Sequence, residues 1–169
     1  MHKDRKANRL HGYDYKRNAR YFVTSCVQDR ICCLGEIRDD EMLLNEFGKI
    51  AQQQFKWLEQ QYPYVDLYSF IVMPNHIHGI IEINDRVGTG RDLSVRKQTD
   101  TPIKIKSLSE LMGAYKTTTS KQIHLAGLAD FMWQRSFHDH IIRNEEAFLR
   151  ISNYIQNNPA NWKDDKFYN

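Results

Sequence analysis

The chain has 169 residues and a formal net charge of +3 at pH 7, with 24 Lys and Arg against 21 Asp and Glu. This length fits one domain with its own hydrophobic core. No apolar run approaches the roughly 20 residues that span a bilayer, and the basic start lacks the apolar segment of a secretory signal. We therefore expect a cytoplasmic protein without a membrane segment, whose mild net charge does not by itself distinguish a nucleic-acid binder from other proteins.

Basic residues are concentrated at the start of the chain. Only Asp4 and Asp14 oppose the cations of the first twenty positions, which are Lys3, Arg5, Lys6, Arg9, Lys16, Arg17 and Arg20. Such a cluster is suited to phosphate binding, and we predict a basic N-terminal arm over residues 1–20. A solvated tail is the alternative interpretation.

Hydrophobic patterning predicts an alternation of strands and helices. Runs rich in β-branched and aromatic residues predict four strands, at 21–27, 65–73, 76–83 and 131–137, the last with an extension to Ile142 left open. Apolar residues at helical spacing predict three helices, at 39–61, 107–123 and 144–157, the second opening on a capping box at Ser107 and Glu110. Residues 84–106 show no period, which predicts a long mobile loop.

The order strand, helix, strand, strand, helix, strand, helix is a split βαβ arrangement. It favours the α+β class, with a ferredoxin-like antiparallel sheet (βαββαβ) and both early helices on one face. The other face is left for a site and for the last helix. We assign residues 21–162 to this domain and residues 163–169 to a C-terminal tail.

Two histidines occupy the third predicted strand with one residue between them. Since strand side chains alternate between faces, His76 and His78 share one face while Ile77 and Ile81 share the other and pack under the helices. Two imidazoles side by side on the open face are able to bind one cation. A surface or hydrogen-bonded pair of histidines is the alternative.

The last predicted helix carries a tyrosine and an amide one turn apart. Tyr154 and Asn158 lie on the flank of an apolar stripe formed by Phe148, Ile151 and Ile155, at the boundary between core and solvent. The two polar groups point the same way. An ordinary boundary tyrosine, with Asn158 ending the helix before Pro159, fits the spacing equally well.

Four segments together resemble the REP-associated tyrosine transposases, which belong to the HUH single-strand transposase superfamily of insertion sequences. In chain order they are RLHGYDYKRNARYFVT from Arg9, MPNHIHGII from Met73, FMWQRSFHDHIIR from Phe131 and YIQNNPANW from Tyr154. The resemblance extends from Arg9 to Trp162, apart from the loop at 84–106.

The resemblance implies a metal site and a nucleophile. It implies that His76, His78 and Asn158 bind a divalent metal and that Tyr154 attacks DNA, leaving a 5′-phosphotyrosine and a free 3′-hydroxyl. Many insertion-sequence relatives carry Gln at the position of Asn158, so the shorter amide here leaves direct and water-bridged ligation open. A mixed, mostly hard donor set suits Mg²⁺ or Mn²⁺ better than Zn²⁺. The implied substrate is single-stranded DNA with a hairpin.

Cations elsewhere in the chain are candidates for DNA phosphates, with ordinary surface cations as the alternative. Together with the arm, the candidate set is Arg5, Lys6, Arg9, Lys104, Lys106, Lys116, Arg135 and Arg143. Trp133 and Phe137 are better explained by core packing than by base stacking.

The resemblance therefore implies a metal-dependent DNA transposase-type endonuclease that nicks and rejoins single strands near hairpins, as a monomer or homodimer. One alternative is a cleavage-inactive or host-retained hairpin-binding protein. Another is a replication-initiator-like HUH nuclease, which the short chain disfavours.

Overall fold

A four-stranded antiparallel sheet forms the centre of the fold, with strands in the order β4-β5-β1-β6. The computed structural model describes residues 18–84 and 103–168, so most of the predicted basic arm and of the predicted loop lies outside the described residues. The sheet strands are β1 (Ala19–Cys26), β4 (Val65–Met73), β5 (His76–Ile83) and β6 (His138–Ile142).

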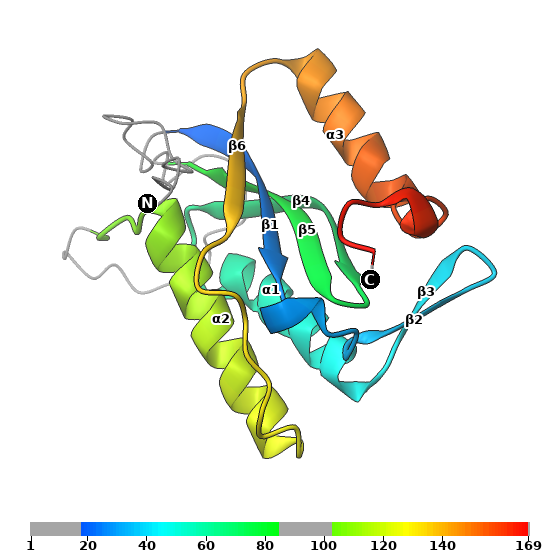
Figure 1. Cartoon of the computed structure of the whole chain (residues 1–169). Helices are drawn as coiled ribbons and strands as arrows, with labels where there is room; N and C mark the ends of the chain where they lie inside the picture. Colours follow the sequence, from blue (N-terminus) through cyan, green and yellow to red (C-terminus); the bar gives the residue numbers. More distant parts are fainter. Residues whose placement is uncertain (1–17, 85–102, 169) are drawn as a thin grey trace, which may run out of the picture.

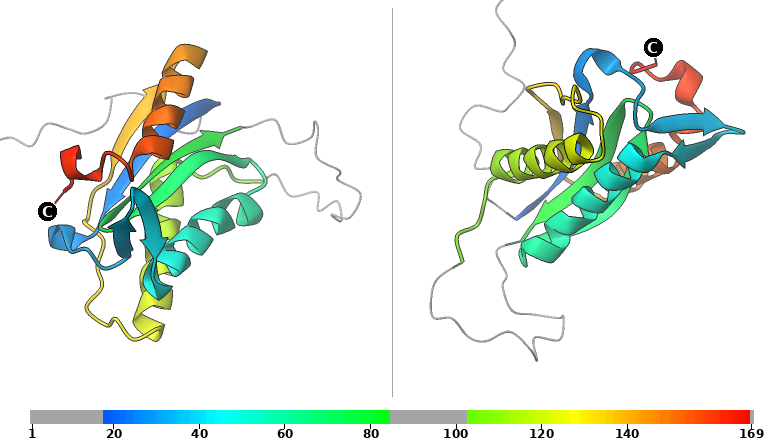
Figure 2. Two further views of the ribbon diagram at one scale, coloured as in Figure 1. Left: turned by 90° about the vertical axis from the view of Figure 1, so that its right-hand side faces the viewer. Right: turned by 90° about the horizontal axis from the view of Figure 1, so that it is seen from below.

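Helices cover both faces of this sheet (Figures 1 and 2). α1 (Glu46–Gln61) and α2 (Leu108–Leu125) lie together on one face, and α3 (Glu145–Asn157) lies on the other. Short 3₁₀ turns follow β1, at η1 (Gln28–Arg30), and α3, at η2 (Trp162–Asp164). The predicted α+β class, with two helices on one face and the last helix opposite, is confirmed.

Strand alternation in β5 divides the core into two layers. Ile77 and Ile81 are buried with residues of α1 and α2 in the main core, whereas Ile80 is buried against α3. Gly79 lies on the main-core side, where an added Cβ would come within 2.5 Å of the Phe55 ring. The face assignment made from the sequence therefore holds along the strand.

Local caps set the helix starts. Ser107 and Glu110 form both hydrogen bonds of the predicted capping box at α2. Asn45 accepts a hydrogen bond from the Gly48 amide at the start of α1, and Asn144 does the same for Ala147 at α3. None of the helices in the described parts of the chain combines the length and apolarity that a membrane crossing needs.

The predicted start of the first helix is wrong. Instead of a helix from Asp39, residues before α1 form a hairpin of β2 (Gly35–Arg38) and β3 (Glu41–Leu44). Asp39 and Asp40 have φ of 51° and 61°, which is the backbone of a two-residue hairpin turn. The helix was predicted to start at Asp39, but α1 begins only after its Asn45 cap.

The last strand is also displaced. It occupies residues 138–142, and the aromatic run before it forms only an isolated bridge between Val27 and Trp133. Phe131, Trp133 and Phe137 are buried in the main core, so their alternation reflects packing of a loop rather than a strand. The Lys116 ammonium donates to the carbonyl oxygens of residues 134 and 136, which satisfies backbone groups that a ladder would otherwise bond.

Candidate metal and nucleophile site

The two histidines of β5 lie at the end of the sheet beside the β4–β5 turn. His76 pairs with Cys26 and His78 with Thr24 across the β1–β5 ladder. Both side chains point to the α3 side, as predicted, but that side is not open here. His76 is 0% and His78 1% exposed, because α3 and the segment after it cover them.

The hydrogen bonds of Asn75 fix the tautomer of His76. The Asn75 amide nitrogen donates to the carbonyl oxygens of Arg30 and Phe167, at 3.1 and 2.9 Å. The amide oxygen must then be the atom that faces His76 Nδ1, at 2.8 Å, so this nitrogen carries the proton and donates it. In the neutral ring, Nε2 is left with a free lone pair, which is the form that binds a metal.

β1 holds the ring of His78 without fixing its tautomer. Its Nδ1 lies 2.7 Å from the Thr24 hydroxyl, which is able to accept or donate a proton. Its Nε2 lies 3.0 Å from His76 Nε2, so the two atoms that remain for a ligand face each other. Adjacent ligands of an octahedral ion with bonds of about 2.1 Å are separated by about 3 Å, which matches this spacing.

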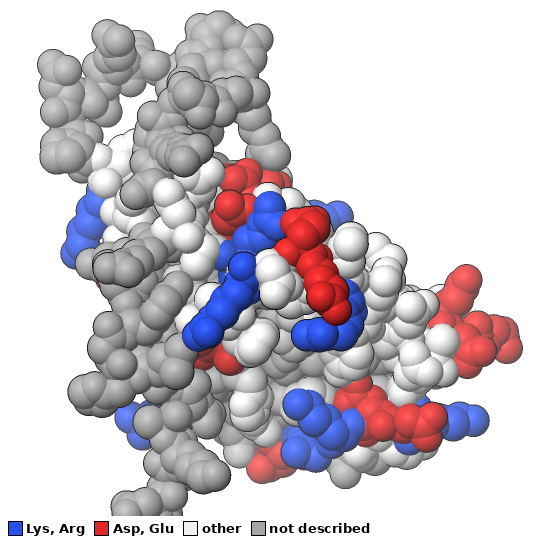
Figure 3. Space-filling view, turned by 90° about the horizontal axis from the view of Figure 1, so that it is seen from above, with Lys and Arg blue, Asp and Glu red and all other residues white. Residues whose placement is uncertain are grey.

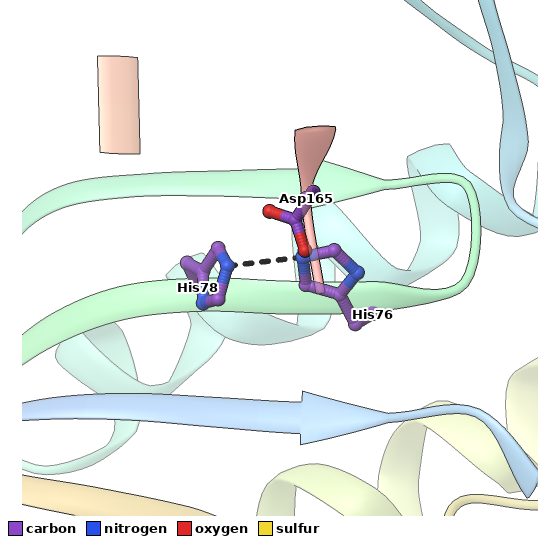
Figure 4. A group of neighbouring side chains, drawn as sticks. All are labelled: His76, His78 and Asp165. Atoms are coloured by element: carbon purple, nitrogen blue, oxygen red, sulfur yellow. Dashed lines mark hydrogen bonds between the residues drawn. The ribbon is translucent and has the colours of Figure 1, made fainter. Parts of the chain in front are cut away.

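A carboxylate completes the group (Figure 4). Asp165, from the segment after α3, places an oxygen near both rings, and the ligand atoms of His76, His78 and Asp165 all lie within 4.8 Å of one another. The Asn158 side-chain nitrogen donates to Asp165 Oδ2 at 2.8 Å. Asp165 was not among the predicted ligands, and its segment was predicted to be a C-terminal tail. The available signal was an acidic residue shortly after the helix that carries Tyr154.

Tyr154 contacts this group from α3. Its hydroxyl lies 3.3 Å from His78 Nε2 and donates to Asp165 Oδ2 at 3.3 Å. The side chain is 42% exposed, so one side of the phenol is open to a ligand while the other touches the buried site. The predicted boundary position of Tyr154 is therefore confirmed.

Aromatic side chains enclose the two imidazoles and shift their pKa values. Ring centroids of Phe167 and Trp162 lie 4.7 and 5.9 Å from that of His76. Burial lowers the pKa of His76 to about 4 and the pKa of His78 well below its usual value. Both rings are therefore neutral at pH 7, as metal ligation requires.

The pKa of Tyr154 moves in the opposite direction. Burial first, and then the charge of Asp165 and the hydrogen bond to it, raise the pKa of Tyr154 to about 12. Without a cation, this phenol stays protonated at neutral pH and is a weak nucleophile.

The donor set fits a hard or borderline divalent ion. Among the described residues, the amide oxygen of Asn158 is one of the buried side-chain atoms without a hydrogen-bond partner. The two imidazole nitrogens and the Asp165 carboxylate make a mixed nitrogen and oxygen group that could hold a divalent metal ion.

The predicted DNA contacts fall at both ends of the sheet. Arg135 lies at the site end, since its loop bonds to Cys26 and pairs with Val27, and Lys116 of α2 reaches the same loop. The Lys116 ammonium is engaged by backbone carbonyls, whereas Arg135 is exposed. Arg5, Lys6 and Arg9 lie outside the described residues.

The remaining cations lie far from the site. Lys106 donates its amide to the Tyr64 hydroxyl, at the start of β4, with Lys104 just before it. Arg143 follows the last residue of β6, which pairs with the start of β1. Figure 3 looks down on that far end and shows basic and acidic side chains intermingled there, so its visible surface has no single sign.

Comparisons with known proteins place the chain among relatives. No protein-family model matches it. A Haemophilus influenzae protein described only as uncharacterized is 33% identical over 168 residues, covering 97% of this chain and 93% of its own length. The solved structure of a REP-associated tyrosine transposase bound to a REP hairpin superposes with a TM-score of 0.59 at 18% identity, covering 94% of this chain and 76% of that one. At this identity the superposition establishes a shared fold.

Proposed function

Because the chain belongs to one family with the Haemophilus influenzae protein and has the fold of a REP-associated tyrosine transposase, we propose that it is a DNA transposase-type endonuclease. It nicks and rejoins single-stranded DNA near hairpins, in the cytoplasm, using a divalent metal. The observation that carries this proposal is the contact between Tyr154 and His78, which brings the candidate nucleophile to the candidate metal site across 76 residues of sequence.

The proposed metal ligands are His76, His78 and Asp165, with Asn158 adding its orphaned amide oxygen directly or through water. When bound there, Mg²⁺ or Mn²⁺ polarises the scissile phosphate and offsets the negative charge at the site. Asn75 and Thr24 orient the two rings so that their Nε2 atoms converge.

Tyr154 supplies the nucleophile in this proposal. Its Oη forms a bond to phosphorus and the bond from phosphorus to the 3′-oxygen breaks. Water gives a proton to the leaving 3′-oxygen, and the phenolic proton released from Tyr154 neutralises the resulting hydroxide. That phenolic proton passes first to Asp165 Oδ2, which already accepts it in a hydrogen bond. The product is a 5′-phosphotyrosine and a free 3′-hydroxyl, and the reverse reaction rejoins strands because the phosphoester bond is conserved.

The test is a search for the covalent adduct. The protein is incubated with pooled single-stranded hairpin oligonucleotides and Mn²⁺ or Mg²⁺, and adducted peptides are mapped by mass spectrometry. We expect attachment at Tyr154 and none in Tyr154→Phe, which keeps the ring and loses only a partly exposed hydroxyl. Tyr168→Phe is the matched control, since Tyr168 is similarly exposed.

Two results would overturn parts of the proposal. Attachment at any other residue, or an adduct in Tyr154→Phe, refutes the nucleophile assignment. Hairpin binding without any adduct in either metal leaves a binding protein rather than an endonuclease.

A further inference from the structure

An open groove lies beside α2, outside the metal and nucleophile site. It has a volume of about 710 Å³ and runs between the second half of α2 and the returning segment 131–135. In Figure 1 this segment runs back alongside α2 before it enters β6. The volume is within the range of sites that hold small organic groups.

The lining of the groove combines cations with an apolar floor. The lining contains basic residues and no acidic one. Lys121 and Arg135 are exposed. Phe131 and Trp133 form a buried apolar floor, and Met132 is 59% exposed at the edge. Cations beside apolar and aromatic groups are the combination that holds unpaired nucleotides, through phosphates and bases respectively.

Contacts through η1 link the segment that lines the groove to the candidate site. The Met132 carbonyl accepts from the Gln28 amide, which ties the groove to η1. From η1, the Arg30 guanidinium lies over the Phe167 ring at 5.6 Å and donates to the Lys166 carbonyl oxygen. Phe167 in turn packs on His76. A single DNA strand that left the groove over η1 would therefore reach the candidate site without crossing the β-sheet.

We infer that this groove binds unpaired nucleotides of the single strand, with phosphates on Lys121 and Arg135 and a base against Met132 at the edge of the apolar floor. The inference rests on the proposed function, which supplies the single-stranded substrate. The groove would hold the part of the DNA strand that lies beyond the reacting phosphate. It would therefore determine how much flanking DNA is bound.

Charge removal tests the phosphate contacts. In the metal-free Tyr154→Phe background, Lys121→Gln with Arg135→Gln is compared with a matched control, Lys49→Gln with Lys56→Gln, which removes two exposed cations from α1. Binding of an unpaired strand of about 15 nucleotides is measured across a salt series. Losing two phosphate contacts should flatten the logarithmic salt slope by about 1.4 and weaken binding roughly tenfold near 0.15 M salt, and the control should change neither.

Crosslinking tests the base contact. A strand carrying 5-iodouracil is irradiated with the same protein, and we expect crosslinks within residues 131–135. Met132→Glu, which places an exposed carboxylate at the edge of the floor, should remove them. An unchanged salt slope in the groove double variant, or crosslinks formed only by a fully paired stem, overturns the inference.

The outcome is separable from that of the proposed function. If wild-type protein forms the Tyr154 adduct and the groove variants bind like the control, the groove inference fails and the nuclease stands. If no adduct forms but the groove variants lose affinity as expected, the groove stands and the nuclease fails.

Discussion

Acid should destabilise this protein through its buried histidines. In the unfolded chain a histidine has a pKa near 6.5, whereas burial lowers the pKa of His76 in the folded protein to about 4. Between these two values the unfolded state binds one more proton, so stability falls as the pH is lowered. The stability that the neutral His76 ring provides is fully present above about pH 6.5 and is lost by about pH 4.

The magnitude follows from the size of the shift. Each pKa unit corresponds to about 1.4 kcal/mol, so His76 alone should lower the free energy of unfolding by about 2 kcal/mol between pH 7 and pH 5, and by about 3 kcal/mol at pH 4. This is a large share of the roughly 5–15 kcal/mol that stabilises a typical domain. His78, whose pKa is also lowered by burial, adds to the same trend.

Urea unfolding from pH 7 to pH 5 in the presence of a chelator measures this effect without competition from metal. In His76→Asn, the free energy of unfolding should depend less steeply on pH, because the titrating ring is gone. The loss of ring packing should lower the stability of this variant equally at every pH. His140→Asn removes an exposed histidine and should keep the wild-type slope. Parallel pH profiles for wild type and His76→Asn would refute the reasoning.

Three further predictions follow from the site and the arm. Asp165→Asn should weaken Mn²⁺ binding at least tenfold in calorimetry and lower the pKa of Tyr154, because the charge of Asp165 raises it; wild-type Mn²⁺ affinity would place Asp165 outside the ligand set. Asn158→Ala should slow cleavage and increase the metal concentration required, with peptide mapping still locating the adduct on Tyr154. Deleting residues 1–9 should weaken DNA binding and flatten its salt dependence, with cleavage retained at high substrate concentration; unchanged affinity would indicate a solvated tail.

Periodicity and capping in the sequence determined the elements that position the site. The alternation of β5 placed His76 and His78 on one face with Ile77 and Ile81 on the other, because successive strand side chains necessarily point in opposite directions. The capping box at Ser107 marked the start of α2, since those two hydrogen bonds are local to one turn.

Where two local interpretations competed, the sequence alone favoured the wrong one. Asp39 and Asp40 suit either a helical first turn or a hairpin turn, and pairing of β2 with β3 decided for the hairpin. The alternating aromatics from Phe131 suit a strand, but burial of their rings in the core and the Lys116 ammonium on the backbone hold them in a loop.

Only the tertiary structure decided the chemistry available to the histidines. Their burial, and hence the lowered pKa of each, comes from α3 and the segment after it closing over β5. The same closure brings the Asp165 carboxylate to both rings and to the Tyr154 hydroxyl. No periodicity encodes such contacts, because they join groups far apart in sequence through the packing of one element on another.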